Sequence, residues 1–516
     1  MKSVVDGATM RLLEEKAFAG KETVESLMDV VGKGLASFLS TLLPASGESP
    51  HILLIAGKGN NGADGYSALS LLAEKNIPTV VWQIVPPPEG SILEKRQKKY
   101  LQKGGKVISF PDVPQMESPF LILDGIYGAG FKGPPDGTSS KAILWANAQH
   151  GLIVSIDLPS GLDPTTGEVP GEAIIADYTV ACHLPKRGCF LGKGWEYTGI
   201  MHVVSLPIET PKSDLCLLEE EDVVHLIPRR RRTQNKFEAG TVVALAGSHG
   251  MMGAASLSCE AAHTVGAGYV RALLPESAPF LEGLLPREAI KTFFKKPADC
   301  LPYFERADSF LIGPGLGRTP ATFSLLDKVW PHLHVPAVID ADALFWLSTI
   351  HQKDWDIRGK ILTPHLGEAG RMFQKKITCV DEDLLRDLRA IVAATDSIIV
   401  LKGAPTFILS AGSPVFIMPR GDPGMATAGA GDVLTGMIAG FLAQKTQPLA
   451  ACLLGTWVHG LAGEIAASER TSYATLASSI LNEIPSALSL VLEQAAHGAF
   501  RDYVPFGRVE SSRVDF

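Results

Sequence analysis

Features that would place this chain in a secretory compartment or on nucleic acid are scarce. No two of its seven cysteines form a C-x-x-C pair, and their odd number and scattered positions indicate neither a disulfide framework nor a zinc site. The N-terminus carries Asp6, Glu14 and Glu15 where a signal peptide needs an apolar core. The net charge of -8 lacks the basic excess with which a general nucleic-acid binder neutralises phosphates. We therefore expect a cytoplasmic protein that does not bind nucleic acid.

An uninterrupted apolar run long enough to cross a membrane is also lacking. The most apolar region, about 433 to 463, is broken by Lys445, Gln447 and Pro448, which favours a buried helix pair over a membrane span. The four arginines at 229–232 lie in a stretch without helix or strand periodicity, and we interpret them as part of a solvated linker.

What is present is a soluble globular composition, with 46% hydrophobic and 20% charged residues. A chain of 516 residues is too long for one ordinary core, so two or three domains are expected. Prolines and runs of like charge interrupt the periodicity between 206 and 235, which places the domain boundary there. The 51 glycines suggest tight turns or close backbone approaches to a ligand.

Both halves have the pattern of an α/β fold. Two amphipathic helices fill the first 40 residues, and from His51 onward short apolar runs alternate with helical stretches. A second such series begins near Gly240. Alternating buried strands and helices predict doubly wound parallel sheets, in which ligands bind at the carboxyl ends of the strands.

The first glycine-rich strand end is Gly57–Gly62, GKGNNG. It satisfies G-x-G-x-x-G, but the next strand is not followed by the acid that binds a ribose in dinucleotide-binding domains, so the signal for an ordinary dehydrogenase is weak. Glycines and a helix N-terminus still suit a phosphate, and Asn60, Asn61 and Asp64 add side-chain oxygens.

Later strand ends in the same half add Asp124, Asp157, Ser160 and Asp163. Three converging loops with oxygen ligands are able to hold a phosphate, a ribose or a hard cation. We interpret Asp163 as a turn or helix cap and Asp157, which follows an apolar strand, as the catalytic candidate.

The motifs GNNGADG, LILDGIYGAGF, SIDLPSGLDPTTG and PKRG resemble the NAD(P)HX epimerase family, also called the YjeF N-terminal domain, over most of residues 1 to 210. The resemblance implies a Rossmann-like epimerase domain at 1–211 and a potassium ion held by Asn61 (or its neighbour Asn60), Asp124 and Ser160. It also implies contacts with the hydrated dinucleotide from Asn60, Asn61, Gly62, Ala63, Asp64, Gly128, Ala129, Gly130, Phe131, Lys132, Gly133, Pro134 and Asp157.

One position departs from that family. Ala63 stands where the family usually has glycine, and because alanine tolerates positive φ poorly, we expect a slightly altered loop. The alternative of an N-terminal half that binds without catalysing therefore stays open.

The most informative stretch of the second half is 420–444, in which a G-A-G-D turn opens a long apolar helix. Backbone N–H groups at such a helix start stabilise negative charge on a transferring phosphoryl group. Asp432 in this turn is placed either to take a proton from a substrate hydroxyl or only to cap the helix. We favour catalysis because further phosphate-binding features accompany it: LKGAPT, TPHLGE, IGPGLG and GSHGMMGAA.

In this order, the motifs resemble the ribokinase superfamily and, within it, the ADP/ATP-dependent NAD(P)H-hydrate dehydratases, over roughly 225 to 500. The resemblance implies a dehydratase domain at 225–505 that uses Mg2+ and ADP. Glu368 is placed either to position a hydrated magnesium ion or only to serve as an acid in the first turn of a helix. The implied hydrate contacts are Ala254, Gly315, His365 and Asp432, and the implied nucleotide contacts are Lys402, Gly403, Ala404, Pro405, Thr406 and Gly431.

Three departures keep a second interpretation open. The family's HKG reads Asn235-Lys236-Phe237, its TPHPGE has Leu366, and its GGSGD reads AGAGD at 428–432, closer to sugar and vitamin kinases. The alternative is a small-molecule kinase with a non-catalytic N-terminal binding domain.

The two resemblances together imply an enzyme that repairs hydrated nicotinamide nucleotides. The N-terminal domain would interconvert the R and S epimers of NADHX and NADPHX. The C-terminal domain would dehydrate the S epimer at the expense of ADP, giving AMP and phosphate. We also expect a homo-oligomer, with the N-terminal helices as the candidate interface.

Overall fold

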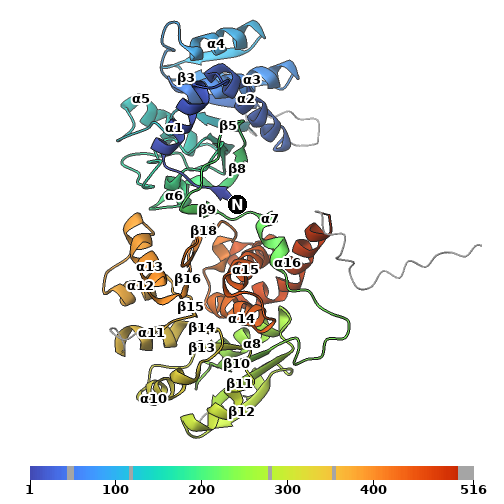
Figure 1. Ribbon diagram of the computed structural model, residues 1–516. Helices are drawn as coiled ribbons and strands as arrows, with labels where there is room; N and C mark the ends of the chain where they lie inside the picture. The colour runs from blue at the N-terminus through green and yellow to red at the C-terminus, as the bar shows by residue number, and fades with distance from the viewer. Residues whose placement is uncertain (44–50, 116–119, 277–281, 351–355, 498–516) are drawn as a thin grey trace, which may run out of the picture. The chain divides into compact units, whose positions relative to one another are not determined.

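The computed structural model describes residues 1–43, 51–115, 120–276, 282–350 and 356–497, and the chain divides into two compact units (Figure 1). The N-terminal unit comprises Lys2–Leu217 with the short segment Cys379–Arg386, and the C-terminal unit comprises Met1, Leu218–Thr378 and residues 387–516. The domain limits drawn from the sequence, 1–211 and 225–505, stay predictions, and position 505 lies outside the described residues.

The N-terminal unit is built on a seven-stranded sheet of order β4-β3-β2-β5-β6-β7-β8, and every neighbouring pair is parallel. The strands of this sheet are β2 (His51–Ala56), β3 (Thr79–Gln83), β4 (Lys106–Ser109), β5 (Phe120–Gly125), β6 (Leu152–Ile156), β7 (Tyr178–Cys182) and β8 (Ile200–Val204). Outside this sheet, the same unit contains β1 (Lys2–Ser3) and β9 (Leu215–Leu217), which pair with each other. Its helices are α1 (Gly7–Phe18), α2 (Val24–Thr41), α3 (Asn60–Glu74), α4 (Ile92–Gln102), α5 (Gly137–Asn147) and α6 (Gly194–Thr198).

Helices cover both faces of this sheet, as the sequence predicts. Alternate residues of β2 face opposite sides: Leu54 packs with residues of α2, α3 and α4, whereas Leu53 packs with residues of α5. A parallel sheet buried on both faces brings the carboxyl ends of its strands to one edge, and the loops that follow β2, β5 and β6 meet there.

The stretch after β2 differs from the predicted loop. The sequence predicts a glycine-rich loop that includes Ala63, but α3 already begins at Asn60, directly after an extended Gly59. Its glycines allow close packing: a Cβ on Gly65 would come within 2.5 Å of Leu54. The predicted strain at Ala63 is wrong, because this fully buried residue lies inside the helix and not in a loop at positive φ.

The C-terminal unit carries a sheet in which β12, β11, β10, β13, β14, β15 and β16 run parallel and β17 and β18 complete the order antiparallel. The strands are β10 (Thr241–Leu245), β11 (Tyr269–Pro275), β12 (Ile290–Phe294), β13 (Ser309–Ile312), β14 (Ala337–Ile339), β15 (Lys360–Leu362), β16 (Ile398–Leu401), β17 (Thr406–Ser410) and β18 (Val415–Met418). The helices are α7 (Glu220–Val223), α8 (Met252–Thr264), α9 (Leu301–Phe304), α10 (Pro320–Val329), α11 (Ala341–Ile350), α12 (Leu366–Phe373), α13 (Glu382–Thr395), α14 (Ala430–Ala443), α15 (Pro448–Arg470) and α16 (Ala477–His497).

Figure 1 shows α10 to α12 on one side of this sheet and α8, α14, α15 and α16 on the other. The apolar region at 433 to 463 forms two helices, α14 and α15, that are largely buried within the unit. Among the described residues, α15 is the one helix long and apolar enough to cross a membrane, but 78% of its most apolar window is buried. That burial is typical of a core helix, as the breaks at Lys445 and Pro448 predict.

Candidate functional site

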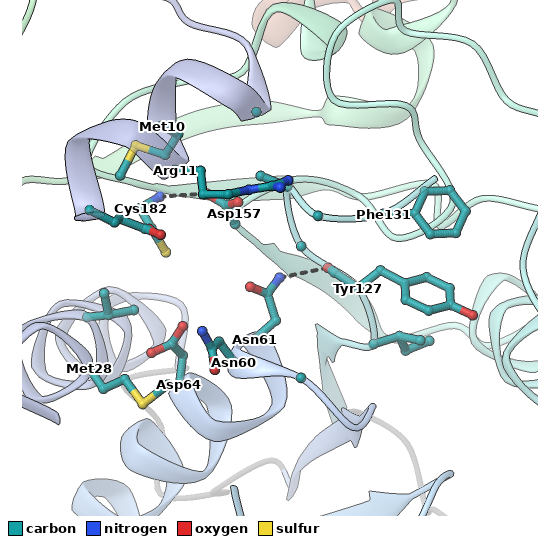
Figure 2. Close-up of a pocket in the computed structure, with 18 of the residues that line it drawn as sticks. Met10, Arg11, Met28, Asn60, Asn61, Asp64, Tyr127, Phe131, Asp157 and Cys182 are labelled. Atoms are coloured by element: carbon teal, nitrogen blue, oxygen red, sulfur yellow. Dashed lines mark hydrogen bonds between the residues drawn. The ribbon is translucent and has the colours of Figure 1, made fainter. Parts of the chain in front are cut away.

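A cavity of about 660 Å³ opens in the N-terminal unit where the loops after β2, β5 and β6 meet (Figure 2). Helices α1 and α2 supply its other wall, including Met10 and Met28. The structure places most of the predicted hydrate contacts in its lining: Asn60, Asn61, Asp64, Gly128, Ala129, Gly130, Phe131, Lys132, Pro134 and Asp157. Gly62, Ala63 and Gly133 do not line the cavity.

Asp157 stands at the end of β6 with φ at 71°, a backbone conformation that non-glycine residues rarely adopt. Its Oδ1 accepts hydrogen bonds from the Lys186 ammonium and, at 3.3 Å, from the backbone N–H of Cys182. Lys186 is 1% exposed, and the pair is buried. Burial alone lowers the pKa of the Lys186 ammonium, but the Asp157 carboxylate outweighs it and the pKa is raised. The Lys186 ammonium therefore stays charged.

Asp64, on the first turns of α3, is in a different state. It is 7% exposed, and its Oδ1 is buried without a hydrogen-bond partner among the described residues. Burial raises the pKa of this carboxyl well above its usual range, and the negative charges of Asp157 and Glu14 raise it further. The cavity thus contains one carboxyl with a raised pKa and one carboxyl that is ion-paired.

The residues predicted to hold potassium also come together. Asp124 is fully buried; its Oδ1 accepts the Ser160 hydroxyl at 2.6 Å, and its Oδ2 accepts the Ser155 hydroxyl at 2.8 Å. Asn61 donates to the carbonyl oxygens of Tyr127 and Ile156, both at 2.7 Å. Hydroxyl, carbonyl and carboxylate oxygens around a buried carboxylate are the donor set of a hard cation, so these residues fit potassium.

In the C-terminal unit, the predicted phosphate lysine is the centre of a buried charge cluster. The Nζ of Lys402 lies 2.6 Å from Asp340 Oδ1 and 3.9 Å from Glu368 Oε2. Thr435 of α14 donates to the other oxygen of Asp340 at 2.6 Å. Burial lowers the pKa of Lys402, but the charges of Asp340 and Glu368 outweigh it and the pKa is raised. This lysine is therefore held charged and in one position, not solvated at a strand end.

Asp432 lies in the first turn of α14, whose N-cap Gly429 is left-handed with φ at 96°. Burial, assisted by the negative charge of Asp340, raises the pKa of Asp432 to about 7, although Lys402 lowers it in part. A carboxyl with a pKa near the working pH is suited to general-base catalysis. Gly431 permits the close approach of the lysine, since a Cβ on it would lie 3.3 Å from Lys402 Nζ. Alanine there would require the ammonium to shift by a few tenths of an ångström.

The other predicted residues of this unit lie in two groups. Gly315 has φ at 59°, and a Cβ on it would lie 3.0 Å from the Cβ of Ala254. Ala254 and Gly315, both predicted to contact the hydrate, are therefore neighbours. His365 forms a parallel bridge with Lys402, which joins the TPHLGE and LKGAPT loops. The imidazole of His365 caps α12, accepting from the Gly367 N–H at 3.0 Å.

Glu368 combines both of its predicted features. It lies in the first turn of α12 and is 5% exposed, and its Oε2 accepts the His365 N–H at 2.9 Å. No group of three or more His, Cys, Asp or Glu side chains suited to a metal ion occurs in the part of the chain that the structure describes. A magnesium ion bound through water, with phosphate oxygens as its ligands, fits this donor set better than direct coordination.

Four further residues belong to these sites and were not singled out from the sequence: Glu14, Lys186, Asp340 and Thr435. Lys186 was inside the PKRG motif, and Asp340 directly follows the apolar run of β14, so both had a signal. Glu14 lies on α1, more than 40 residues from the first loop, and only the tertiary structure brings it to the cavity.

The fold and these two sites define a two-domain α/β enzyme with a cavity at the strand ends of its N-terminal unit and a buried cluster of charged side chains in its C-terminal unit. Two family models match the chain: one described as YjeF-related protein N-terminus over residues 24–188, and one described as NAD(P)H-hydrate dehydratase over residues 242–486. The bifunctional NAD(P)H-hydrate repair enzyme of Moorella thermoacetica is 33% identical over 86% of this chain and 88% of its own, and that of Escherichia coli is 32% identical over 85% of each. The chain belongs to the family of bifunctional NAD(P)H-hydrate repair enzymes.

Solved structures similar to the C-terminal half include a ribokinase-like superfamily protein from Enterococcus faecalis, with 27% identity and a TM-score of 0.48, covering 55% of this chain and 98% of that one. An ADP/ATP-dependent NAD(P)H-hydrate dehydratase from Bacillus subtilis, co-crystallised with ATP and Mg2+, has 28% identity and a TM-score of 0.44, covering 54% of this chain and 98% of that one.

Proposed function

We propose that the C-terminal unit dehydrates S-NAD(P)HX with ADP as phosphoryl donor, and that the N-terminal unit interconverts the R and S epimers. The observation that carries the proposal is the joint position of Asp432 and Lys402 at the start of α14, in a chain whose family is that of the bifunctional repair enzymes. The choice of ADP rests on the resemblance to bacterial enzymes with the same domain fusion.

In the dehydratase reaction, Asp432 takes the proton of the hydrate's hydroxyl, and the resulting oxygen attacks the terminal phosphorus of ADP, releasing AMP. Lys402 and the N–H groups of the first turn of α14 stabilise the charge on the transferring group. The hydroxyl has then become a phosphate ester, a far better leaving group. Loss of phosphate and of a ring proton restores the nicotinamide double bond. Gly403, Ala404, Pro405 and Thr406 complete the proposed nucleotide contacts, and Ala254, Gly315 and His365 those with the hydrate.

Two ions belong to this proposal. Magnesium would bind beside Glu368 through bridging water molecules. It would neutralise charge on the nucleotide phosphates. Potassium would be held by Asn61, Asp124 and Ser160, where it would fix the loops that follow β5 and β6. We also propose a cytoplasmic location and a homo-oligomer; light scattering coupled to size-exclusion chromatography measures the latter.

The decisive experiment follows absorbance at 340 nm while the chain acts on a mixture of R- and S-NADHX with ADP and Mg2+. Recovery of the whole mixture would support both activities, and a parallel run with ATP would identify the donor. Recovery of the S fraction alone, followed by a slow spontaneous tail, would contradict the epimerase. A stable phosphorylated product without recovered NADH would contradict the dehydratase and favour the small-molecule kinase.

A further inference from the structure

The least explained side chain in the N-terminal unit is Asp64. A buried carboxyl normally accepts several hydrogen bonds, because an unsatisfied polar group in a low-dielectric site costs about 1 to 3 kcal/mol. Asp64 is 7% exposed, lines the cavity, and leaves its buried Oδ1 without a partner among the described residues. A group kept in this state at a ligand cavity is positioned for something that enters the cavity.

Asp64 and Asp157 reach the cavity from different elements. Figure 2 shows the two carboxyl groups on facing sides, Asp64 rising from α3 beside Met28 and Asp157 descending from the end of β6 beside Arg11. The structure also gives them different surroundings. Lys186 compensates the charge of Asp157, whereas Asp64 has no ion pair among the described residues, and the negative charges that act on it are those of Asp157 and Glu14.

We propose that Asp64, in its protonated form, is the general acid of the epimerisation and that Asp157 is the general base on the opposite face of the substrate ring. This inference rests on the proposed epimerase function and deepens it. It assigns a chemical role to two carboxyl groups whose environments differ, which is the arrangement by which one site performs acid and base chemistry together.

The chemistry of the substrate makes such a pair sufficient. In hydrated NADH the hydroxyl sits on a ring carbon bonded directly to the ring nitrogen. Asp64 donates its proton to that hydroxyl, the carbon–oxygen bond breaks, and water leaves while the nitrogen lone pair forms a carbon–nitrogen double bond. A second water adds to the same carbon from the opposite face and gives its proton to Asp157. Nothing is oxidised or reduced. Proton exchange with bulk water returns the proton from Asp157 to Asp64 after each turnover, and the reverse reaction exchanges the two roles.

The surroundings of Asp64 favour its protonated form. Burial is the largest cause of its raised pKa, the carboxylates of Asp157 and Glu14 act in the same direction, and the guanidinium of Arg96 opposes them. Glu14 is itself a half-buried carboxyl whose pKa is raised by burial and by Asp157. On the opposite side, the Oδ1 of Asp157 accepts the hydrogen bonds from Lys186 and Cys182, and no donor among the described residues occupies its Oδ2, which is left for the incoming water.

The test compares Asp64→Asn with the unchanged chain and with Asp163→Asn. The control makes the same carboxyl-to-amide change at a turn outside the cavity, where Asp163 Oδ1 accepts the Thr165 N–H at 2.9 Å. Purified R-NADHX is incubated without ADP, so that the dehydratase is silent, and the epimers are separated by chromatography. We expect Asp64→Asn to lower kcat of epimerisation by about 100- to 10,000-fold with little change in KM. Dehydration of the S epimer with ADP should stay at the level of the unchanged chain.

Two further readouts separate an acid from a structural residue. Epimerisation by the unchanged chain should fall at alkaline pH as Asp64 loses its proton, and the residual activity of Asp64→Asn should lack that fall. In water enriched in oxygen-18, the newly formed S epimer should carry the label in its hydroxyl. An Asp64→Asn chain that epimerises at the unchanged rate, or an S epimer without label, would overturn the inference and leave the epimerase standing. An unchanged chain that does not epimerise at all would overturn the proposed function together with the inference.

Discussion

Asp432 is expected to lower the free energy of unfolding of the chain, and the size of this effect follows from the pKa of its carboxyl group. The folded chain raises the pKa of this carboxyl from 3.8 to about 7. A change of one in pKa corresponds to about 1.4 kcal/mol of free energy. Ionised Asp432 therefore destabilises the folded state by up to about 4 kcal/mol. This is an upper value because the side chain is partly exposed to water. Asp432→Asn removes the cost and should stabilise the chain at neutral and alkaline pH.

The pH dependence gives this prediction its sign. Because the pKa is raised on folding, the folded state holds the proton more tightly than the unfolded chain, and stability is lost as pH rises from about 4 towards 7. Asparagine does not titrate, so the stability advantage of Asp432→Asn should grow by about 2 to 3 kcal/mol between pH 5 and pH 8. Urea unfolding of the Asp432→Asn chain and of the unchanged chain, each at pH 5 and pH 8, measures this difference in stability. The N-terminal unit contributes equally to the stability of both chains.

Dehydratase activity should rise with pH, whereas the stability of the unchanged chain falls. If Asp432 acts as a base, the dehydratase kcat/KM of the unchanged chain should rise about tenfold between pH 6 and pH 8, as the carboxyl ionises around pH 7. Asp432→Asn should lose at least about a hundredfold in kcat. A stability difference that is the same at pH 5 and pH 8, or an Asp432→Asn chain that is less stable at pH 8, would refute the reasoning.

Three further substitutions have defined outcomes. Burial raises the pKa of Asp432 and Lys402 offsets part of the rise, so Lys402→Met should move the pH midpoint of dehydration upward in a pH profile and weaken ADP binding in calorimetry. Lys186→Met should destabilise the chain by about 3 to 5 kcal/mol in urea, because it leaves the buried Asp157 carboxylate unpaired. Gly315→Ala should raise KM for the S hydrate without raising that for ADP, because alanine at φ 59° is strained by about 1 to 2 kcal/mol and its Cβ would lie 2.6 Å from a backbone oxygen.

Each of these outcomes has a matched comparison. Lys402→Arg keeps the charge and should preserve the pH midpoint, so a midpoint shifted equally by both substitutions would count against the charge argument. Lys186→Met with Asp157→Leu removes both members of the pair and should recover much of the lost stability. Gly412, at φ 71° with open space around it, is a control for Gly315, since alanine there is strained without touching a neighbour. Equal KM effects at both glycines would contradict a local role.

The sequence by itself determined the fold class and the position of most site residues. Short apolar runs that end in glycine specify buried parallel strands with loops at their carboxyl ends, and a parallel sheet leaves those loops one edge on which to meet. For that reason Asp157 and Asp432 could be selected as catalytic candidates without coordinates, and their catalytic roles stay predictions. The break at Lys445 and Pro448 likewise marked two helices where composition alone allowed a membrane span.

Only the tertiary structure decided the environment of each group. The spacing of GNNGADG fits a loop, but packing of α3 against β2 extends the helix back to Asn60 and removes the predicted strain at Ala63. Lys186 lies 29 residues from Asp157, and Asp340 lies 62 residues from Lys402, so no local pattern pairs them. A pKa depends on burial and on charges that arrive from distant segments. The sequence therefore named the carboxyl groups, and the fold decided that Asp157 is ion-paired while Asp64 and Asp432 hold protons more tightly than usual.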